Sequence, residues 1–264
     1  MESKKDIVQS VFQVPHWYLK KTHNIWVRVE TVQEFLKDQK FYRILDIGCG
    51  DGSLSVPLLN PERHLTLLDF SDGMLSVARS RVPKDAHDRV EIVNNDVMTA
   101  SLEPHSYDLI LCVGVLAHAE SPEALLERIV YWLKPGGILI LEQTEARHVV
   151  THVTLFLEKL ARFFSPEKYQ RNAIHGPQLL SLLDSKGLDL KATYRYSLPL
   201  PGMHRVASQR MLYGLVRLFF GVYPHNRLSS LGNECLYYLR KRPESREVAV
   251  EVELLSRESR QLYR

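Results

Sequence analysis

The chain has 264 residues, of which 45% are hydrophobic and 25% are charged, and its formal net charge is +3. These values are ordinary for a globular protein and exclude a disordered or fibrous chain. The length suits one full core with an appended cap, and so small a net charge gives no sign of a nucleic-acid footprint. We therefore expect no nucleic-acid partner.

The three cysteines, Cys49, Cys112 and Cys235, lie far apart and form no Cys-x-x-Cys pair. We expect them to be buried free thiols in a reducing compartment, with no metal site. The N-terminus has no apolar core behind its charged residues, and no run of about 18 apolar residues occurs anywhere in the chain. The sequence therefore predicts a cytoplasmic protein.

In chain order, residues 1–40 are predicted to form a helical cap. Between residues 41 and 142, short apolar runs alternate with helix-like stretches, a rhythm typical of βαβ units that feed a parallel sheet. The predicted strands of this region are 43–47, 65–69, 90–94, 108–113 and 138–142. Helices are predicted at 72–82 and 122–133, with Ser71 and Ser121 as N-caps, and Lys134-Pro135-Gly136-Gly137 is expected to stop the second helix and turn the chain.

Residues 143–243 are predicted to insert a cap and to complete the sheet. We expect helices at about 149–164, 177–186 and 205–220 and strands at 187–196 and 234–241. The tail 244–264 is ambiguous, because three alternating valines favour a strand while its charged end is typical of a helix. The predicted organisation is therefore an N-terminal cap (1–40), a core (41–142), an insertion with sheet completion (143–243) and a tail (244–264).

The segment from Ile44 to Ser53 is the most informative part of the core. A buried strand runs into glycines at positions 48, 50 and 52, and a helix-forming stretch is expected to follow. Glycines let the backbone approach a ligand closely, and a helix N-terminus after such a turn attracts an electron-rich group. The spacing disfavours the G-x-G-x-x-G fingerprint of a dinucleotide site without excluding it.

Two acidic residues follow the next two strands. Asp69 ends the second predicted strand, where a carboxylate can accept hydrogen bonds from both hydroxyls of a ribose. Asp96 follows the third strand, at the place where the amine of an adenine ring would lie. A nucleoside-containing cofactor is therefore predicted at the carboxyl ends of the strands.

With these residues in order, the chain resembles class I S-adenosylmethionine-dependent methyltransferases. The resemblance rests on the D-x-G-x-G-x-G loop from Asp46 to Gly52, Asp69, Asn95-Asp96-Val97, the 113–118 stretch and Leu133-Lys134-Pro135-Gly136-Gly137. It implies an α/β fold, a doubly wound, mostly parallel sheet of seven strands with a helical cap. It also implies S-adenosylmethionine as the cofactor.

Carried over by position, the resemblance implies a role for each motif residue. Gly48 and Gly50, in the loop that begins at Asp46, would line the methionine part of the cofactor, and Val113 would offer backbone beside its amino group. Many members have Glu where this chain has Ala117, so no acid is assigned there.

The same resemblance implies how the nucleoside is held. Asp69 would bind the ribose, Phe70 and Met74 would cover one adenine face, and Asp96 with Val97 would contact the adenine edge. The structural alternative is that Asp69 and Asp96 cap strand ends and that Phe70 and Met74 are core residues.

Methyl transfer from a sulfonium is an in-line displacement, so alignment matters more than acid or base chemistry. If the acceptor is a hydroxyl or an amine, a base helps, and the candidates near the strand ends are His118 and Glu142, with a structural role for His118 left open. Glu142 near a strand end, and His16, Tyr18 and His148 from the caps, are candidate acceptor-binding residues.

The acceptor is predicted to be small and either apolar or lipid-like. The chain lacks the Asn/Asp-Pro-Pro-aromatic run of enzymes that methylate nucleic-acid bases and the carboxylate cluster of the metal-dependent catechol type. The alternative to an enzyme is a non-catalytic S-adenosylmethionine binder that serves a partner.

The apolar stretch 205–223 has three interpretations. It packs into the core, it forms a lid over an apolar acceptor, or it is an interfacial helix that meets a membrane. Membrane contact is not the default expectation. Arg210 and Arg217, seven residues apart, are expected to share one narrow polar face of this helix.

Overall fold

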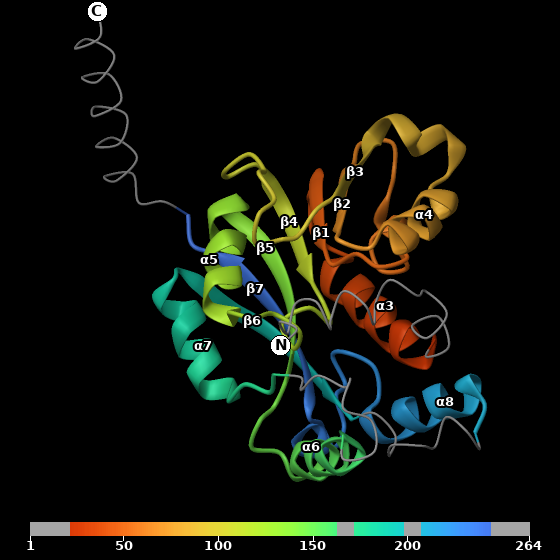
Figure 1. Cartoon of the computed structure of the whole chain (residues 1–264), viewed down its shortest axis with the longest axis vertical. Helices are drawn as coiled ribbons and strands as arrows, with labels where there is room; N and C mark the ends of the chain where they lie inside the picture. Colours follow the sequence, from red (N-terminus) through yellow and green to blue (C-terminus); the bar gives the residue numbers. More distant parts are fainter. Residues whose placement is uncertain (1–21, 163–171, 198–206, 244–264) are drawn as a thin grey trace, which may run out of the picture.

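The computed structural model describes residues 22–162, 172–197 and 207–243 of the chain, and Figure 1 shows a central sheet with helices on both faces. Its strands are β1 (Arg43–Ile47), β2 (His64–Asp69), β3 (Val90–Asn94), β4 (Tyr107–Cys112), β5 (Leu133–Thr144), β6 (Leu188–Tyr196) and β7 (Glu234–Lys241). Its helices are α3 (Thr22–Leu36), α4 (Asp72–Arg81), α5 (Pro122–Trp132), α6 (Val149–Arg162), α7 (Gly176–Ser185) and α8 (Gln209–Phe220). Short 3₁₀ turns are η1 (Val56–Leu58), η2 (Lys84–Arg89) and η4 (Ser229–Leu231). The expected seven-stranded fold is confirmed.

The strand order is β3-β2-β1-β4-β5-β7-β6. Strands β1 to β5 pair in parallel, and β7 lies antiparallel between β5 and β6. The chain winds outward from β1 in one direction and from β4 in the other. In a sheet of this kind the ligand crevice lies at the carboxyl ends of the strands, where the winding reverses.

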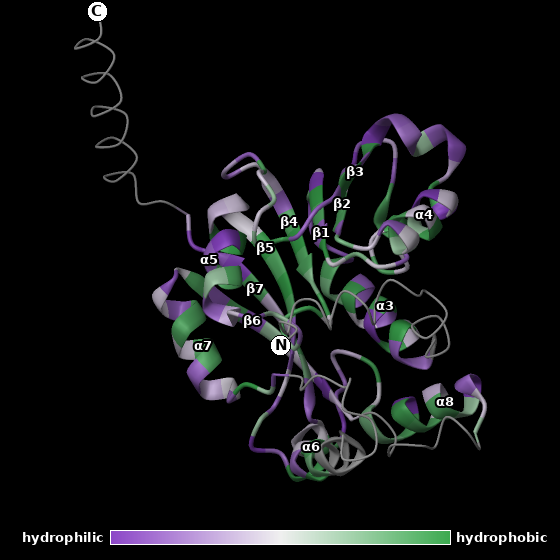
Figure 2. Ribbon diagram, viewed as in Figure 1, coloured by the Kyte–Doolittle hydropathy of each residue, from purple (hydrophilic) through white to green (hydrophobic). Residues whose placement is uncertain are grey.

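The sheet is buried on both faces, and the helices divide between the two. One apolar cluster joins α3, α4 and α8 to one face of the sheet. The other cluster joins α5 and α7 to the opposite face. Figure 2 shows the hydrophobic strands between these layers. All three cysteines are buried and free, as expected.

Serine caps begin two of the helices, as the sequence predicts. Ser71 Oγ accepts a hydrogen bond from Met74 N, and Ser121 Oγ accepts one from Ala124 N. Each bond satisfies an amide that the first turn of a helix leaves without a partner.

The expected helix after the glycine loop was wrong. Residues 48–63 form turns and only the short η1. Gly48, Gly50 and Gly52 all have positive φ, at 61°, 54° and 71°. A left-handed backbone cannot continue into a right-handed helix, and Pro57 inside η1 removes a backbone donor.

Strand β5 begins earlier than predicted. Helix α5 ends at Trp132, and the strand starts at once with Leu133. Tyr107 pairs with Leu133 while Leu109 pairs with Ile138, so the extra residues form an irregularity in the ladder. Gly136, with φ of +75°, allows this bend.

Helix α8 is half core and half surface. Leu212, Val216 and Phe220 are buried, and the helix packs against α3 and β6. Arg217, expected on one narrow polar face with Arg210, turns toward α3. Its side chain is only 12% exposed and forms a 2.5 Å ion pair with Glu30 of α3. The face that carries it meets α3, which supplies the charge partner.

Parts of the predicted organisation lie outside the described residues. These parts are residues 1–21, with His16 and Tyr18, and the tail 244–264. The division into cap, core, insertion and tail stays a prediction. Within the described ranges, every helix is too short or too polar to cross a membrane.

Candidate cofactor and acceptor site

The glycine turn closes the carboxyl end of β1 against its neighbours. Gly48 N donates to Leu68 O of β2 at 2.8 Å. A Cβ added to Gly48 would lie 2.5 Å from Val115 Cγ2, on the far side of the turn. The position therefore requires glycine for its space and for its positive φ.

Asp69 lies at the end of β2, directly beside this turn. Its Oδ2 accepts a hydrogen bond from Gly50 N at 2.9 Å, and its Oδ1 accepts one from Ser71 N at 2.8 Å. Burial raises the pKa of Asp69, and these backbone donors oppose that shift. A carboxylate has about four acceptor sites, so each oxygen can still accept a hydroxyl from a ligand.

Asp96 begins the turn that follows β3. Its Oδ1 accepts a hydrogen bond from Met98 N at 2.8 Å, and Asn95 Oδ1 accepts one from Asp96 N at 2.8 Å. Phe70 and Val97 are half-buried, whereas Met74 is only 2% exposed. The core interpretation therefore suits Met74 better than it suits Phe70.

A small hollow opens beside the glycine turn, and its lining includes Ile25, Arg28, Asp46, Gly48 and Val113. The Asp46 carboxyl is 2% exposed, and its Oδ2 has no hydrogen-bond partner among the described residues. Burial, together with the nearby carboxylates of Asp69 and Asp51, raises the pKa of Asp46 to about 7. A buried acceptor of this kind favours a ligand that brings a donor or a positive charge.

A buried ion pair borders the hollow. Arg28 of α3 bonds to Glu142 of β5 through both ends of its guanidinium, with Nε–Oε1 at 2.9 Å and Nη2–Oε2 at 2.6 Å. Tyr196 of β6 donates its hydroxyl to the same Glu142 Oε1 at 2.9 Å. Burial and then the charge of Glu142 raise the pKa of Tyr196 well above its usual range, so the phenol stays protonated.

Glu142, a predicted acceptor-binding residue, is thus held by two protein partners. Gly114, which follows β4, faces the same guanidinium, because a Cβ there would lie 3.5 Å from Arg28 Nη1. The structure therefore brings the loop after β4, α3 and β5 together around one cation. Sequence reasoning missed Arg28 and Tyr196, since no local pattern links them to a glutamate so distant in the chain.

The two described histidines of the prediction lie in different settings. His118 is half-buried in a turn after β4, where its own amide donates to Val115 O at 2.8 Å. The segment that begins at Asn172 anchors this turn, because Asn172 N donates to Ala117 O at 2.7 Å. His148 Nδ1 instead accepts from Val150 N at 3.2 Å, and its Nε2 lies 3.3 Å from Ser230 O, so the ring caps α6.

No residue of α8 lines the hollow within the described ranges. Ile25 and Arg28 of α3 occupy that position, and α8 packs on the other side of α3. Helix α3, rather than α8, therefore covers the described part of the site.

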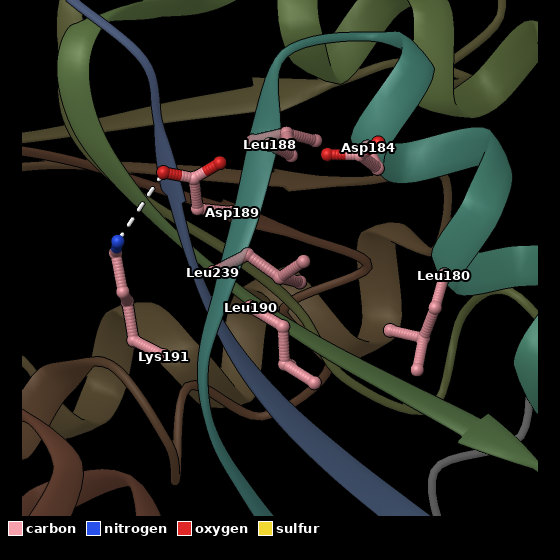
Figure 3. A pocket seen from close by; sticks show the side chains of 7 residues that line it. All are labelled: Leu180, Asp184, Leu188, Asp189, Leu190, Lys191 and Leu239. Atoms are coloured by element: carbon pink, nitrogen blue, oxygen red, sulfur yellow. Dashed lines mark hydrogen bonds and ion pairs between the residues drawn. The ribbon is translucent and has the colours of Figure 1, made fainter.

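A second hollow lies between α7 and the edge strand β6 (Figure 3). Leu188 pairs with Lys241, the last residue of β7, so this hollow lies at the end of the sheet opposite the glycine turn. Asp189 and Lys191 flank it and pair at 3.2 Å. Its place at the amino end of β6 excludes it from the crevice of a doubly wound sheet.

Comparison with known proteins finds methyltransferases. Residues 45–141 match the family model described as a methyltransferase domain. Over 99 residues, 38% of this chain, it is 35% identical to a demethylmenaquinone methyltransferase of Clavibacter sepedonicus. Over 149 residues, 55% of this chain, it is 28% identical to a ubiquinone biosynthesis O-methyltransferase of Vibrio cholerae. The chain spans 40% and 60% of the lengths of these relatives.

Solved structures share the fold. The magnesium protoporphyrin IX methyltransferase of Synechocystis, with bound S-adenosylhomocysteine, superposes with a TM-score of 0.61 at 16% identity, over 90% of this chain and 100% of that one. At that identity the likeness concerns the fold alone. Residues 45–141 therefore match a methyltransferase domain, within a fold that the chain shares with this methyltransferase.

Proposed function

We propose that this chain transfers a methyl group from S-adenosylmethionine to a small apolar or lipid-like organic acceptor at the carboxyl ends of β1, β2, β4 and β5. The observation that carries the proposal is the glycine turn with Asp69 beside it, at the point where the sheet reverses its winding. The named relatives, which carry demethylmenaquinone and ubiquinone biosynthesis in their names, support a lipid-like acceptor.

The residues present suit this cofactor. The turn at Gly48 and Gly50 would admit the methionine part, and the spare acceptor capacity of Asp69 suits the two ribose hydroxyls. The unpartnered Asp46 Oδ2 suits the positive amino group or sulfonium of the cofactor. Asp96, Val97 and Phe70 would enclose the adenine, with Val113 backbone near the amino group.

S-adenosylmethionine supplies an electrophilic methyl group when it is bound. The protein's part is to align the acceptor atom with that methyl group, and alignment alone supplies on the order of 7 to 11 kcal/mol in the best cases. We infer that His118 takes the proton of a hydroxyl or amine acceptor, because it follows β4 at the same edge of the sheet. Arg28, held by Glu142, which also accepts the Tyr196 hydroxyl, would keep one wall of the site rigid.

An acceptor panel tests the function. The purified chain is incubated with methyl-labelled S-adenosylmethionine and quinols of increasing tail length, and the organic phase is counted. Label that enters the organic phase supports the proposal. Cofactor binding without transfer to any acceptor would instead favour a non-catalytic binder.

His118→Ala tests the base, with His152→Ala, an exposed position on α6, as the matched control. Loss of a general base lowers turnover by roughly 100-fold or more. The cofactor dissociation constant from calorimetry should stay unchanged, and the acid limb of the pH profile should disappear. An equal loss of cofactor affinity and turnover would make His118 structural.

A further inference from the structure

Exposed apolar side chains gather on one part of the molecule. Of the twelve large hydrophobic residues that are exposed among the described residues, eight lie on α6, on α8 or in the loop 228–231. These eight, which we call the apolar rim, are Val149, Val153, Phe156, Met211, Leu218, Phe219, Leu228 and Leu231. Clustered apolar exposure marks an interaction surface, whereas scattered residues do not.

Hydrogen bonds make the rim continuous. His148, which caps α6, lies 3.3 Å from Ser230 O of η4, and Asn233 Nδ2 donates to Thr151 Oγ1 of α6 at 3.3 Å. The same loop folds back on α8, because Arg227 N donates to Phe220 O at 3.0 Å. In Figure 1, α6 and α8 lie at the lower end of the molecule.

The rim lies at the same end of the sheet as the candidate site. Helix α6 follows the carboxyl end of β5, and η4 precedes Glu234, which pairs with Thr144 at that end. A ligand that reached the rim would therefore be close to the crevice and not to the hollow between α7 and β6.

Folding does not require the exposed face of α8. Leu212, Val216 and Phe220 already bury one face, and the ion pair of Arg217 with Glu30 anchors the helix to α3. Leu218 and Phe219 are nevertheless 63% and 50% exposed on a well-formed helix. In Figure 2 much of α8 has the green colour of hydrophobic residues.

Exposed cations flank the α8 part of the rim. Residues 207–233 contain no aspartate or glutamate, and they carry Arg210, Arg217 and Arg227. Arg210 lies in the first turn of α8 and Arg227 lies beside Leu228, and both are exposed, whereas Arg217 pairs with Glu30. Apolar side chains flanked by exposed cations suit the anionic headgroups and acyl boundary of a bilayer.

We propose that the apolar rim docks this chain onto the surface of an anionic lipid bilayer. The proposed contact is a peripheral one, made by the exposed side chains of the rim. The proposal deepens the proposed function and rests on it for one point only, that the acceptor is lipid-like and is taken from the bilayer. Docking itself is measured without turnover.

Co-sedimentation of the full chain with vesicles tests the proposal. We expect binding to vesicles of phosphatidylcholine with phosphatidylglycerol, weaker binding to phosphatidylcholine alone, and a decrease with salt. The double variant Leu218→Ser, Phe219→Ser should lower partitioning onto the vesicles roughly tenfold or more, since each substitution removes an apolar side chain that would enter the bilayer. Arg210→Gln and Arg227→Gln should each lower it about fivefold.

Matched controls separate docking from general effects. Tyr131→Ser with Leu190→Ser removes exposed apolar residues elsewhere, and Arg79→Gln with Lys84→Gln removes exposed cations elsewhere. Both should leave partitioning unchanged, and cofactor binding by calorimetry should be intact in every variant. Docking with no methyl transfer would contradict the proposed function and leave the membrane proposal standing.

Three results would overturn the proposal. In the first, the rim variants sediment with vesicles as the wild type does. In the second, the wild type binds no vesicles. In the third, the wild type binds no vesicles and light scattering finds it to be a dimer, whereas the rim variants are monomers. The last result would assign the rim to a second copy of the chain.

Discussion

The two halves of the sheet are built from contacts of very different length along the chain. On the β1–β2–β3 side, Gly50 and Asp69 are 19 residues apart, and Asn94 bonds back to the carbonyl of Asp69 across 25. On the β5–β7–β6 side, Arg28 meets Glu142 across 114 residues, and Tyr213 meets Glu30 across 183. The β1–β2–β3 half, which holds the candidate cofactor site, is thus built from contacts that are short along the chain and can be predicted from the sequence. The other half is assembled from distant segments.

The two halves also differ in what holds them. Backbone amides and glycine conformations shape the cofactor half, so a single motif carries most of its geometry. Buried charges hold the other half, where neither partner is stable alone. Substitutions can disrupt the contacts of one half and leave those of the other intact.

Removal of one partner from the buried pair should have the largest effect. Arg28→Ala leaves Glu142 buried without its cation and should lower the free energy of unfolding by about 3 to 5 kcal/mol. Chemical denaturation measures this loss. Lys186→Ala removes the partner of Glu127, which is 66% exposed, and should cost about 0 to 1 kcal/mol. Equal losses would mean that the buried pair holds nothing together.

Gly48→Ala should come next. Its positive φ costs roughly 1 to 2 kcal/mol for a residue with a Cβ, and the overlap with Val115 adds to that. Gly136→Ala is the matched control, because its φ is +75° and nothing lies within 4 Å of an added Cβ. Thermal unfolding should show a larger loss for Gly48→Ala, and only that variant should bind S-adenosylmethionine more weakly. Equal losses would remove the close approach to Val115 from the account.

Asp69→Ala should weaken cofactor binding by about 1 to 3 kcal/mol, since it removes acceptors for two ribose hydroxyls. Calorimetry with S-adenosylhomocysteine measures it directly. Asp72→Ala, an exposed acid three residues later in α4, should change nothing. An unchanged affinity in Asp69→Ala would place the ribose elsewhere.

The last expected effect is a dependence of stability on pH. Burial raises the pKa of Asp46 from 3.8 to about 7, so the folded chain binds more protons than the unfolded chain between those values. The contribution of Asp46 to stability is therefore present below about pH 4 and is lost as pH rises through about 7. Asp108 and Asp189 have lowered pKa values, so their contributions to stability change only below about pH 4, outside this window. Asp46→Asn should flatten the decline in unfolding temperature between pH 5 and 8, and an unchanged slope would contradict it.

The sequence predicts well those features that depend on contacts between residues close together in the chain. Strands β1 to β4, the caps Ser71 and Ser121 and the free thiols follow from local patterns of burial and hydrogen bonding. The helix expected after the glycine loop was wrong, because three glycines with positive φ at alternate positions, 48, 50 and 52, override the propensity of the residues that follow. The inward position of Arg217 was missed, since only the packing of α8 on α3 brings Glu30 within reach.

Of the candidate site, the sequence predicts the strand-end residues but not their partners. Glu142 is predicted as an acceptor-binding residue, yet nothing near it in the chain indicates its partners Arg28 and Tyr196. His148 shows the opposite problem, because its capping bond to Val150 is local but is indistinguishable from a functional histidine without coordinates. His118 and the assigned cofactor roles remain predictions, and His16 and Tyr18 lie outside the described residues.

A crystal structure with bound S-adenosylhomocysteine tests the central claim most directly. We expect the ribose hydroxyls within hydrogen-bond distance of Asp69, the adenine beside Asp96 and Val97, and the sulfur facing the space bounded by Val113, Gly114 and α3. A nucleoside bound elsewhere, such as in the hollow between α7 and β6, would contradict it.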